Sequence, residues 1–409
     1  MEKSISGEHL KKLELNALLE ITTAISQNVS KEDLFKIFKF TLKGNHLIQK
    51  VALFLKEENN QWYCATSFGV KLDLEKITKE ILESIPKMVH EPRGKYDLLF
   101  EDFDVVMPVY HKDQIFAYVF VDGDEAFGED VRNERFDFIQ TLSNIILYAL
   151  ENKKMFVKQL EQQALNKELE IASKVQSQLI PSRYPTYKNV KFSSKYIPHS
   201  KIGGDYYDLI AKTKTQFYAC IADVSGKGVP AAIFMSNFQA SLRVLIETDQ
   251  DLSTIVQKLN KYIVKNTGGE YFITFFIALI DIENKTIEYI NSGHNHPYLL
   301  NQNTNEVMVL DKGSTFLGAF DKLPSIVSEK LSIENSLLLL YTDGLSETNN
   351  TENEEYGEER IKNCIIKHSE SEIDVLTQSL INELDTFRTS APYKDDITIF
   401  GISLSFENQ

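Results

Sequence analysis

The sequence predicts a mixed α/β (α+β) protein with two domains joined by a long helix. Three observations lead to this prediction. At 409 residues, the chain exceeds the usual size of a single hydrophobic core. Short β-rich runs alternate with amphipathic helical segments in both halves of the chain. Between the halves, a helical period continues for longer than a typical globular helix, which favours a connecting helix.

Residues 13–150 are predicted to form a small α/β domain. Its first two segments, LNALLEITTAISQ and KEDLFKIFKFTLKG, carry apolar residues at helical spacing. Two later stretches, KVALFLKEENNQWYCATSFGV and DVVMPVYHKDQIFAYVFVDG, are each typical of two strands around a polar turn. We therefore expect a sheet flanked by helices.

A helical period begins near Glu134 and continues to the segment IPSRYPTY, whose prolines end it. Apolar residues recur on alternating steps of three and four at Ile139, Leu142, Ile146, Ala149, Phe156 and Leu160, with Lys153 in one core place. The seam changes phase near Gln162 and resumes with Leu165, Ala172, Val175 and Leu179, with Glu168 in a core place. The pattern predicts a coiled-coil linker over 151–182 that makes the chain a homodimer. The alternative is a helix packed along its own domain, because the seam is short and broken.

Residues 183–408 are predicted to form a second domain with a different texture. Strand-like runs follow one another closely, namely TQFYACIADV, YFITFFIALIDI, TIEYINSG, SLLLLYTDG and DITIFGISLS. Helical segments lie between them, namely VPAAIFMSNFQASLRVLIE, LSTIVQKLNKYIVKN and EIDVLTQSLINELDTF. This grouping favours antiparallel sheets packed together with helices outside.

Composition and charge exclude several function classes. With 44 Lys+Arg against 59 Asp+Glu the net charge is −15, which argues against nucleic acid and suits metal ions or a cationic partner. The 3 cysteines are far apart, so neither a disulfide framework nor a CxxC metal site is expected. No apolar run has the length of a signal peptide or of a membrane span, so a cytoplasmic protein without membrane contact is expected.

Acidic residues stand where apolar strands of the second domain meet a glycine or a turn. They are Asp205, Asp223, Asp343 and the pair Asp395 and Asp396. A single aspartate in such a place usually serves a turn. Several converging carboxylates with few basic neighbours would instead raise one another's pKa unless cations intervened. Because these motifs offer only oxygen ligands, Mg²⁺ or Mn²⁺ is favoured over Zn²⁺.

Five motifs carry a family resemblance. They are GGDYYD at 203–208, ADVSGKGVPAAIFMS at 222–236, NSGHNHPYLL at 291–300, YTDGLSET at 341–348 and KDDITIF at 394–400. In order and spacing they resemble the motifs of the bacterial SpoIIE/RsbU-type branch of the PPM (PP2C-like) serine/threonine phosphatases. The resemblance implies a PP2C-like α-β-β-α sandwich with two Mn²⁺ or Mg²⁺ ions at one end and no other cofactor.

The resemblance also assigns the site residue by residue. The metal positions it implies are Asp205, Asp223, Val224, Asp343 and Asp395. Asp205 and Asp223 are the implied catalytic pair, with Asp223 bridging both ions and Val224 offering its backbone carbonyl. Asp396 stands where eukaryotic relatives usually have Asn, and it is the alternative to Asp395 as the last ligand. Eukaryotic members carry a His after the second motif, whereas this chain has DVSG, so the general acid stays unassigned.

Three residues near the motifs admit two interpretations each. His294 and His296 in SGHNHP suggest a transition-metal site, but a structural role is preferred for this loop. Lys227 is either a contact for substrate phosphate or a solvated loop lysine. The acidic run at 351–359 is interpreted as a solvated face or a flap over the site.

The function implied is that of a metal-dependent protein serine/threonine phosphatase. Two ions would activate a water for in-line attack, so no protein nucleophile is needed. The family further implies a phosphorylated anti-anti-sigma (STAS-type) regulator as substrate. The alternatives are an inactive phosphatase-fold scaffold that acts by binding, and a ligand sensor in which catalysis is secondary.

The first domain resembles a GAF sensory domain, which implies a small-molecule ligand or a protein activator. Candidate pocket residues are Trp62, Tyr63, Phe68 and Phe103, although aromatic residues at strand spacing more often belong to a core. The segment 168–182 resembles the switch helix that connects a regulatory module to the catalytic one. A signal at the first domain is expected to change how this helix packs, and so how well the metal site forms.

Overall fold

The computed structural model describes residues 7–45, 48–57, 59–90, 102–111, 114–122, 129–181, 183–248 and 250–406. The chain divides into two compact units, Met1–Gln163 and Ala164–Gln409, and each is described separately. Residue 58 and residues 112–113, at the tips of the two predicted hairpins, lie outside the described residues.

The first unit is built on a five-stranded antiparallel sheet with the order β2-β1-β5-β4-β3. The strands are β1 (Val51–Lys56), β2 (Trp62–Phe68), β3 (Val89–His90), β4 (Val105–His111) and β5 (Gln114–Val121). The helices are α1 (Gly7–Ser26), α2 (Lys31–Asn45), a 3-10 turn η1 (Leu74–Lys76), α3 (Lys79–Glu83) and the start of α4 (Glu129–Gln176). The sheet flanked by helices that the sequence predicts is therefore present.

Alternation along the strands gives this sheet two apolar faces. One face packs on α1, α2 and α4, and the other packs on the segment with η1 and α3. The four aromatic residues proposed as pocket lining are divided between these faces, so a single shared pocket was wrong. Tyr63 and Phe68 pack on the helical face, whereas Trp62 and Phe103 pack on the other. The core interpretation is right for Phe103, which is fully buried.

The first half of α4 packs along its own unit. Ile139, Leu142 and Ile146 are buried in the core against the sheet and α1, so here the own-domain interpretation is right. Lys153 interrupts the predicted seam for a local reason. Its Nζ donates hydrogen bonds to the carbonyl oxygens of Val29, at 2.9 Å, and Asn28, at 3.4 Å, which follow α1.

The second half of α4 exposes its apolar residues. Phe156, Leu160 and Leu165 are all exposed. The helix ends at Gln176, short of the prolines that the sequence suggested as its end, because tight turns over residues 177–180 replace the last helical turn. Leu179 therefore lies beyond the helix and does not belong to a helical seam.

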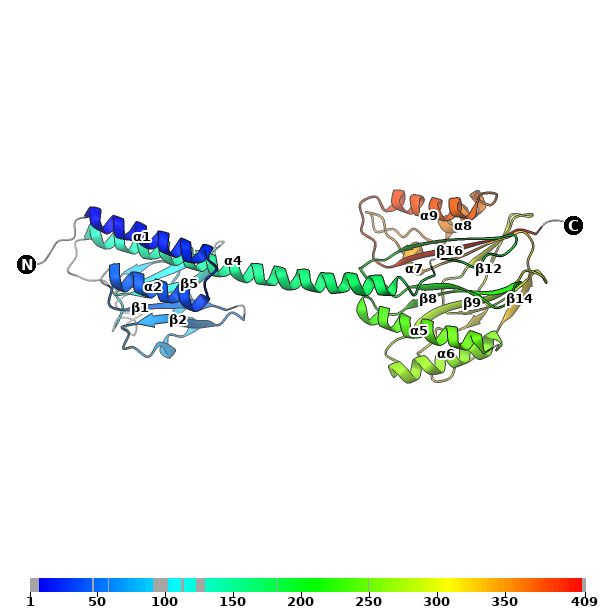
Figure 1. The fold of residues 1–409 in the computed structure, drawn as a ribbon, viewed down its shortest axis with the longest axis horizontal. Coiled ribbons are helices and arrows are strands. Elements are labelled where there is room, and N and C mark those ends of the chain that lie inside the picture. The colour runs from blue at the N-terminus through cyan, green and yellow to red at the C-terminus, as the bar shows by residue number, and fades with distance from the viewer. Residues whose placement is uncertain are drawn as a thin grey trace, which may run out of the picture. The chain divides into compact units, whose positions relative to one another are not determined.

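The second unit is an α-β-β-α sandwich. One sheet has the order β13-β10-β9-β8-β7 with β14 also paired to β10, and the other has the order β12-β11-β15-β16-β6. In Figure 1, α5 and α6 lie outside one sheet, and α8 and α9 lie outside the other. Alternate residues of β8 face the two sides, since Tyr218 and Ala222 contact the helices and Phe217 and Ile221 contact the second sheet.

The bounds of these elements follow the sequence patterns closely. The strands are β6 (Val190–Ile197), β7 (Tyr206–Ala211), β8 (Gln216–Val224), β9 (Ile273–Asp281), β10 (Thr286–Ser292), β11 (Tyr298–Asn301), β12 (Glu306–Val309), β13 (Gly313–Ser314), β14 (Glu329–Ser332), β15 (Ser336–Tyr341) and β16 (Ile397–Leu404). The helices are α5 (Val229–Glu247), α6 (Leu252–Thr267), α7 (Asp343–Ser346), α8 (Glu358–Lys367) and α9 (Ile373–Arg388).

Helix α5 has an apolar composition because it is a layer of the sandwich. It begins after Gly228, whose φ of 72° suits glycine, and it has Pro230 in its first turn. Among the described residues it is the one helix that is long and apolar enough to cross a membrane by composition. Its Met235, Phe238 and Leu242 are buried in the core beneath it.

Candidate metal and catalytic site

Strand pairing brings the four predicted aspartates to one end of the sandwich. Antiparallel pairing of β7 with β8 places Asp205, just before β7, beside Asp223, near the end of β8. Antiparallel pairing of β15 with β16 likewise places Asp343, just after β15, beside Asp395, just before β16. The four carboxylates therefore come from two facing sheets, and none lies in the middle of a strand.

Asp205 is held by two threonines of the opposite sheet. Its Oδ2 accepts hydrogen bonds from Thr342 Oγ1, at 2.9 Å, and from Thr398 Oγ1, at 2.5 Å. All three side chains are buried. Burial, and then the negative charges of Asp223 and Asp396, raise the pKa of Asp205 well above its usual value. These bonds fix one aspartate in position across the two sheets.

Like charges crowd the rest of the site. Burial, followed by the charges of Asp343 and Asp395, raises the pKa of Asp223 to about 8. Burial and then Asp395 also raise the pKa of Asp343. A nearby cation would favour the charged form of each carboxylate and would offset both shifts.

The two last-motif aspartates differ in their surroundings. Asp396 is buried, and both of its oxygens accept backbone N–H bonds, from His199 at 2.8 Å and from Gly204 at 2.7 Å. Asp395 is more exposed, and its negative charge raises the pKa of Asp343. This arrangement favours Asp395 as the ligand and gives Asp396 the task of holding the loop 199–204.

Two glycines allow the backbone to close around the site. A Cβ at Gly203 would overlap the carboxylate of Asp396, and a Cβ at Gly344 would overlap the backbone carbonyl of Asp396. The carbonyl oxygen of Val224 faces the same loop, since a Cβ at Gly204 would stand 3.0 Å from it. The glycines of GGD and TDG are therefore explained by close backbone approach.

One lysine lies among the acidic groups. Lys227 Nζ is 2.6 Å from Asp395 Oδ2 and donates a hydrogen bond of 2.5 Å to the carbonyl oxygen of Lys394. The lysine is half-exposed, so this ion pair is weak and exchangeable. Its ammonium stands where it partly offsets the charge of the aspartate cluster.

The donors fit hard divalent ions. The four carboxylates and the Val224 carbonyl are all oxygen donors, as Mg²⁺ and Mn²⁺ prefer. Within the described residues, no three of these carboxylates bring oxygens within 4.8 Å of one another, whereas Cys364, His368 and Glu383 between α8 and α9 do. The Glu383 carboxylate is already paired with Lys367 at 2.9 Å.

Sequence reasoning missed several residues that support the site. Thr342 and Thr398 have a visible signal, since each is a polar residue next to or inside an apolar strand and both are fully buried. Gln176 at the end of α4 has none. Its Nε2 donates to the carbonyl oxygen of Gly203 at 2.7 Å, and its Oε1 accepts from the Gly203 N–H at 3.4 Å.

Two conspicuous polar residues of the motifs are structural. Asp208, the second aspartate of GGDYYD, is fully buried and accepts bonds from Arg243 Nε at 2.9 Å and from the Tyr206 hydroxyl. His294 is buried, and its ring nitrogens contact Thr274 Oγ1 at 2.8 Å and the carbonyl oxygen of Tyr341 at 3.1 Å. Burial lowers the pKa of His294 to about 3, so the ring is neutral, and the structural interpretation is confirmed.

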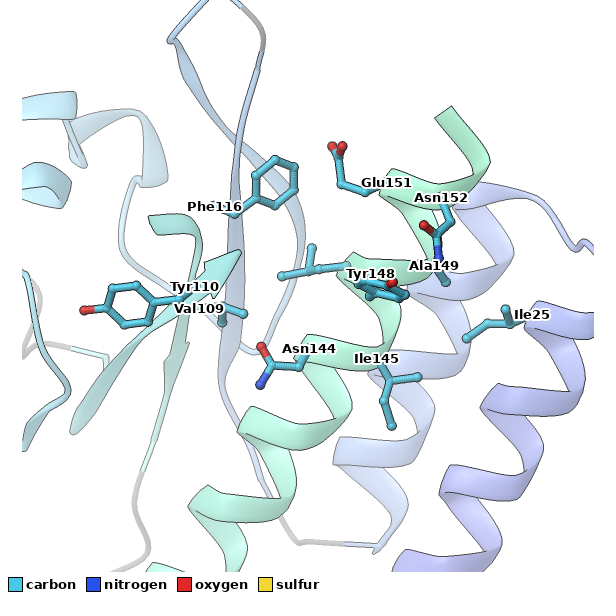
Figure 2. A pocket seen from close by; sticks show the side chains of 11 residues that line it. Ile25, Val109, Tyr110, Phe116, Asn144, Ile145, Tyr148, Ala149, Glu151 and Asn152 are labelled. Atoms are coloured by element: carbon cyan, nitrogen blue, oxygen red, sulfur yellow. The ribbon is translucent and has the colours of Figure 1, made fainter. Parts of the chain in front are cut away.

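The first unit has an open apolar pocket of about 480 Å³. It lies between β4 and β5 on one side and α4 and α1 on the other, as Figure 2 shows with Phe116 and Tyr148 near its opening. Ile25, Val109 and Ile145 make its lining apolar. None of the four aromatic residues proposed from the sequence lines this pocket.

Comparison with known proteins places the second unit. Residues 213–405 match the family model described as Stage II sporulation protein E (SpoIIE). Phosphoserine phosphatase RsbU of Bacillus subtilis is 27% identical over 223 residues, which cover 54% of this chain and 66% of RsbU. Protein IcfG of Synechocystis is 25% identical over 305 residues, which cover 66% of this chain and 47% of IcfG. The chain thus spans less than two thirds of the length of these relatives.

Solved structures agree on the fold. The SiaA-PP2C domain of Pseudomonas aeruginosa superposes with a TM-score of 0.54 at 18% identity, covering 60% of this chain and 99% of that domain. The RsbU and RsbW domains of Rv1364c from Mycobacterium tuberculosis give a TM-score of 0.50 at 20% identity, covering 57% of this chain and 64% of that one. At these identities the likeness shows a PP2C-like fold.

Proposed function

We propose that this chain, whose residues 213–405 match the SpoIIE family model, is a metal-dependent protein serine/threonine phosphatase of the SpoIIE/RsbU-type branch of the PPM phosphatases. The observation that supports this most is the convergence of Asp205, Asp223, Asp343 and Asp395 at one end of the sandwich. An enzyme that worked by a serine or cysteine nucleophile would have no use for such a set of crowded carboxylates.

The four aspartates and the Val224 carbonyl would hold two divalent ions. Such ions supply a water of lowered pKa and offset the charge of the phosphoryl oxygens. The other residues of the site hold these aspartates in position. Thr342 and Thr398 fix Asp205, and the backbone N–H groups of His199 and Gly204 fix Asp396 and thereby the loop before Asp205.

Lys227 is the cation placed to meet the phosphate. Its pairing with Asp395 is half-exposed, so the ammonium is free to turn toward an anion once the carboxylate is engaged otherwise. We therefore assign it to orienting the substrate phosphoryl group.

The test of the proposed activity is hydrolysis of p-nitrophenyl phosphate by the full chain with Mn²⁺, Mg²⁺ or EDTA. We expect turnover with either ion and loss of turnover with EDTA, restored when the ion is added back. Turnover that EDTA leaves unchanged would overturn the two-ion proposal.

We infer that the physiological substrate is a serine-phosphorylated STAS-type anti-anti-sigma protein. The inference is supported by the likeness to RsbU and RsbP of Bacillus subtilis, both named phosphoserine phosphatases. A structural neighbour that joins an RsbU domain to an RsbW domain gives further support. Release of phosphate from such a protein, followed by mass spectrometry, would test it, and a phosphoserine left intact by the active enzyme would contradict it.

We further propose that the chain is a homodimer through the linker at 151–182. The support is the run of exposed apolar residues on α4, which includes Phe156 and Leu160 at predicted seam positions. Burial of such residues against a second copy would remove them from water.

Replacing both Phe156 and Leu160 with Glu is expected to convert a dimer of 46.9-kDa chains into a monomer. Two charges in each seam cannot be buried without partners. Light scattering after gel filtration measures the mass. Lys158→Glu, on the outer face of the predicted seam, is the control and should remain dimeric. A wild-type monomer would contradict the proposal.

We propose that the first unit is a GAF-type sensory domain with a ligand site in its apolar pocket. The support is the five-stranded sheet with helices on its faces and the pocket beside Phe116 and Tyr148 (Figure 2). An apolar lining with Asn144 and Glu151 at its edge suits a small, mostly apolar molecule with one polar group.

A ligand of this class is expected to raise the melting temperature of the wild-type chain and not that of Ile145→Glu. A charge in the pocket would oppose an apolar molecule. A thermal-shift screen with small apolar carboxylates and alcohols makes the measurement. An equal shift in both proteins would place the binding elsewhere.

We propose that Gln176 links the linker helix to the metal site. It is a buried side chain at the last residue of α4, and it bonds both backbone groups of Gly203, two residues before Asp205. A change in the position of this helix would therefore move the loop that carries a metal ligand.

Gln176→Ala is expected to weaken Mn²⁺ binding by about 10-fold, because two hydrogen bonds to a buried loop are lost. Calorimetric titration of the full chain with Mn²⁺ measures the effect. The matched control is Glu170→Ala on the same helix. It removes an exposed ion pair, 2.7 Å long, between Glu170 and Lys201, and it should change the affinity for Mn²⁺ little. Equal affinities in wild type and Gln176→Ala would rule out this link.

A further inference from the structure

A strip of aromatic side chains lies on the second unit beside the loop that follows Asp223. We name it the aromatic strip, and its members are Phe234, Tyr271, Phe272, Phe316 and Phe320. Ring centroids are 5.5 Å apart for Phe234 and Tyr271, 4.9 Å for Phe272 and Phe316, and 6.4 Å for Phe316 and Phe320. The strip thus holds one linked set, Phe272, Phe316 and Phe320, and the stacked pair Phe234 and Tyr271 next to it in the chain.

The strip begins at the catalytic end of the sandwich. Phe272 immediately precedes β9, whose first residue pairs with Val224 of the metal site. The Ser225 N–H donates to the Phe272 carbonyl oxygen at 2.9 Å, and the Phe272 N–H donates to Ser225 Oγ at 2.9 Å. The strip is thus hydrogen-bonded to a residue two positions after Asp223.

The outer rings of the strip are not needed to close the core. Phe272 is 42% exposed and Phe320 is 50% exposed. Beneath them, Ile263, Ile273 and Leu317 already belong to the buried core under α5 and α6. Contiguous exposed apolar surface of this kind is typical of a site that binds a partner.

The segment that follows α7 is acidic. Glu347 follows α7, and its backbone N–H donates to the carbonyl oxygen of Asp343 at 2.8 Å. The exposed Glu352 and Glu354 continue this acidic segment. A phosphorylated protein would be repelled there, whereas the aromatic strip carries no charge. The acidic segment and the aromatic strip therefore differ in what they accept.

We propose that the aromatic strip binds an apolar patch next to the phosphoserine of the phosphorylated STAS-domain substrate, an inference that rests on the proposed function. A phosphoserine side chain is short, so the substrate surface around it must contact the rim of the metal site when the phosphate enters. Because this chain has a net charge of −15, long-range attraction to a phosphoprotein is disfavoured. Apolar contact with the exposed rings of Phe272 and Phe320 supplies affinity that charge does not.

Binding of a serine-phosphorylated STAS-domain protein to the Asp223→Asn chain provides the first test. In that background we expect Phe272→Ala and Phe320→Ala each to raise Kd by about 10-fold, as for aromatic residues central to an interface. Val375→Ala, an exposed apolar residue on α9, is the matched control and should leave Kd unchanged. Unchanged Kd in both strip variants would overturn the proposal.

A second readout compares two substrates in the active chain. We expect Phe320→Ala to lower kcat/KM on the phosphoprotein about 10-fold more than kcat/KM on p-nitrophenyl phosphate, which is too small to reach the strip. Equal losses on both substrates would mean that the strip only supports the site, and a change in chain mass on gel filtration would mean that it binds a second copy. Either result overturns the proposal. Failure of the wild-type chain to hydrolyse either substrate would count against the proposed function, and the binding measurement would still judge the strip.

Discussion

Replacing Asp223 with Asn is expected to lower kcat on p-nitrophenyl phosphate by about 10³-fold at saturating Mn²⁺. Burial, followed by the charges of Asp343 and Asp395, raises the pKa of Asp223 to about 8. The amide keeps the shape of the side chain but removes the charge that would hold and bridge two ions. Steady-state kinetics over a range of Mn²⁺ concentrations measures the loss.

The control for this substitution is Asp374→Asn in the first turn of α9. That aspartate is exposed and lies outside the site, so its loss should change kcat little. The account would be wrong if Asp223→Asn retained wild-type kcat, or if both variants lost activity equally.

Replacing Gly344 with Ala is expected to destabilise the second unit by about 3 kcal/mol and to abolish Mn²⁺ binding. A Cβ at this position would overlap the backbone carbonyl of Asp396, and a backbone atom cannot move aside as a flexible side chain can. The segment with Asp395, just before β16, and the start of α7, which carries Asp343, would have to move apart. Urea unfolding and calorimetric Mn²⁺ titration measure the two effects.

Gly44→Ala is the matched control, because nothing lies within 4 Å of a Cβ built there. It should leave both the unfolding free energy and Mn²⁺ binding close to wild type. A stable Gly344→Ala chain that binds Mn²⁺ normally would contradict the close packing of α7 against β16.

Much of the second unit was predictable because its elements are long and strongly patterned. The five strand-like runs named from the sequence correspond to β8, β9, β10, β15 and β16, and the three helical segments to α5, α6 and α9. The family resemblance is confirmed by the match to the SpoIIE family model over 213–405, which contains the last four of the five motifs. Local pattern sufficed here because periodicity and turn residues agree.

The contacts that support the site were not predictable, because they join residues far apart in the chain. Thr398 bonds Asp205 across 193 positions, and Gln176 bonds Gly203 from a different element. The different surroundings of Asp395 and Asp396 also needed the fold, since the backbone donors of Asp396 come from His199 and Gly204, far away in the chain.

The apolar seam of α4 is compatible with two structures. An apolar seam is satisfied either by the helix's own domain or by a second chain, and the sequence does not distinguish them. Ile139 and Leu142 are buried by their own unit, whereas Phe156 and Leu165 are exposed. Lys153, between these two parts, bonds the carbonyl oxygen that follows α1 and so belongs to the first solution.

We expect two divalent ions to occupy the aspartate cluster at the end of the sandwich. A crystal structure of the chain grown with Mn²⁺, with anomalous data collected at the manganese edge, tests it most directly. The account predicts two anomalous peaks among Asp205, Asp223, Asp343 and Asp395, with the Val224 carbonyl as a further ligand. A fully ordered cluster without manganese, or manganese bound only near Cys364, His368 and Glu383, would contradict it.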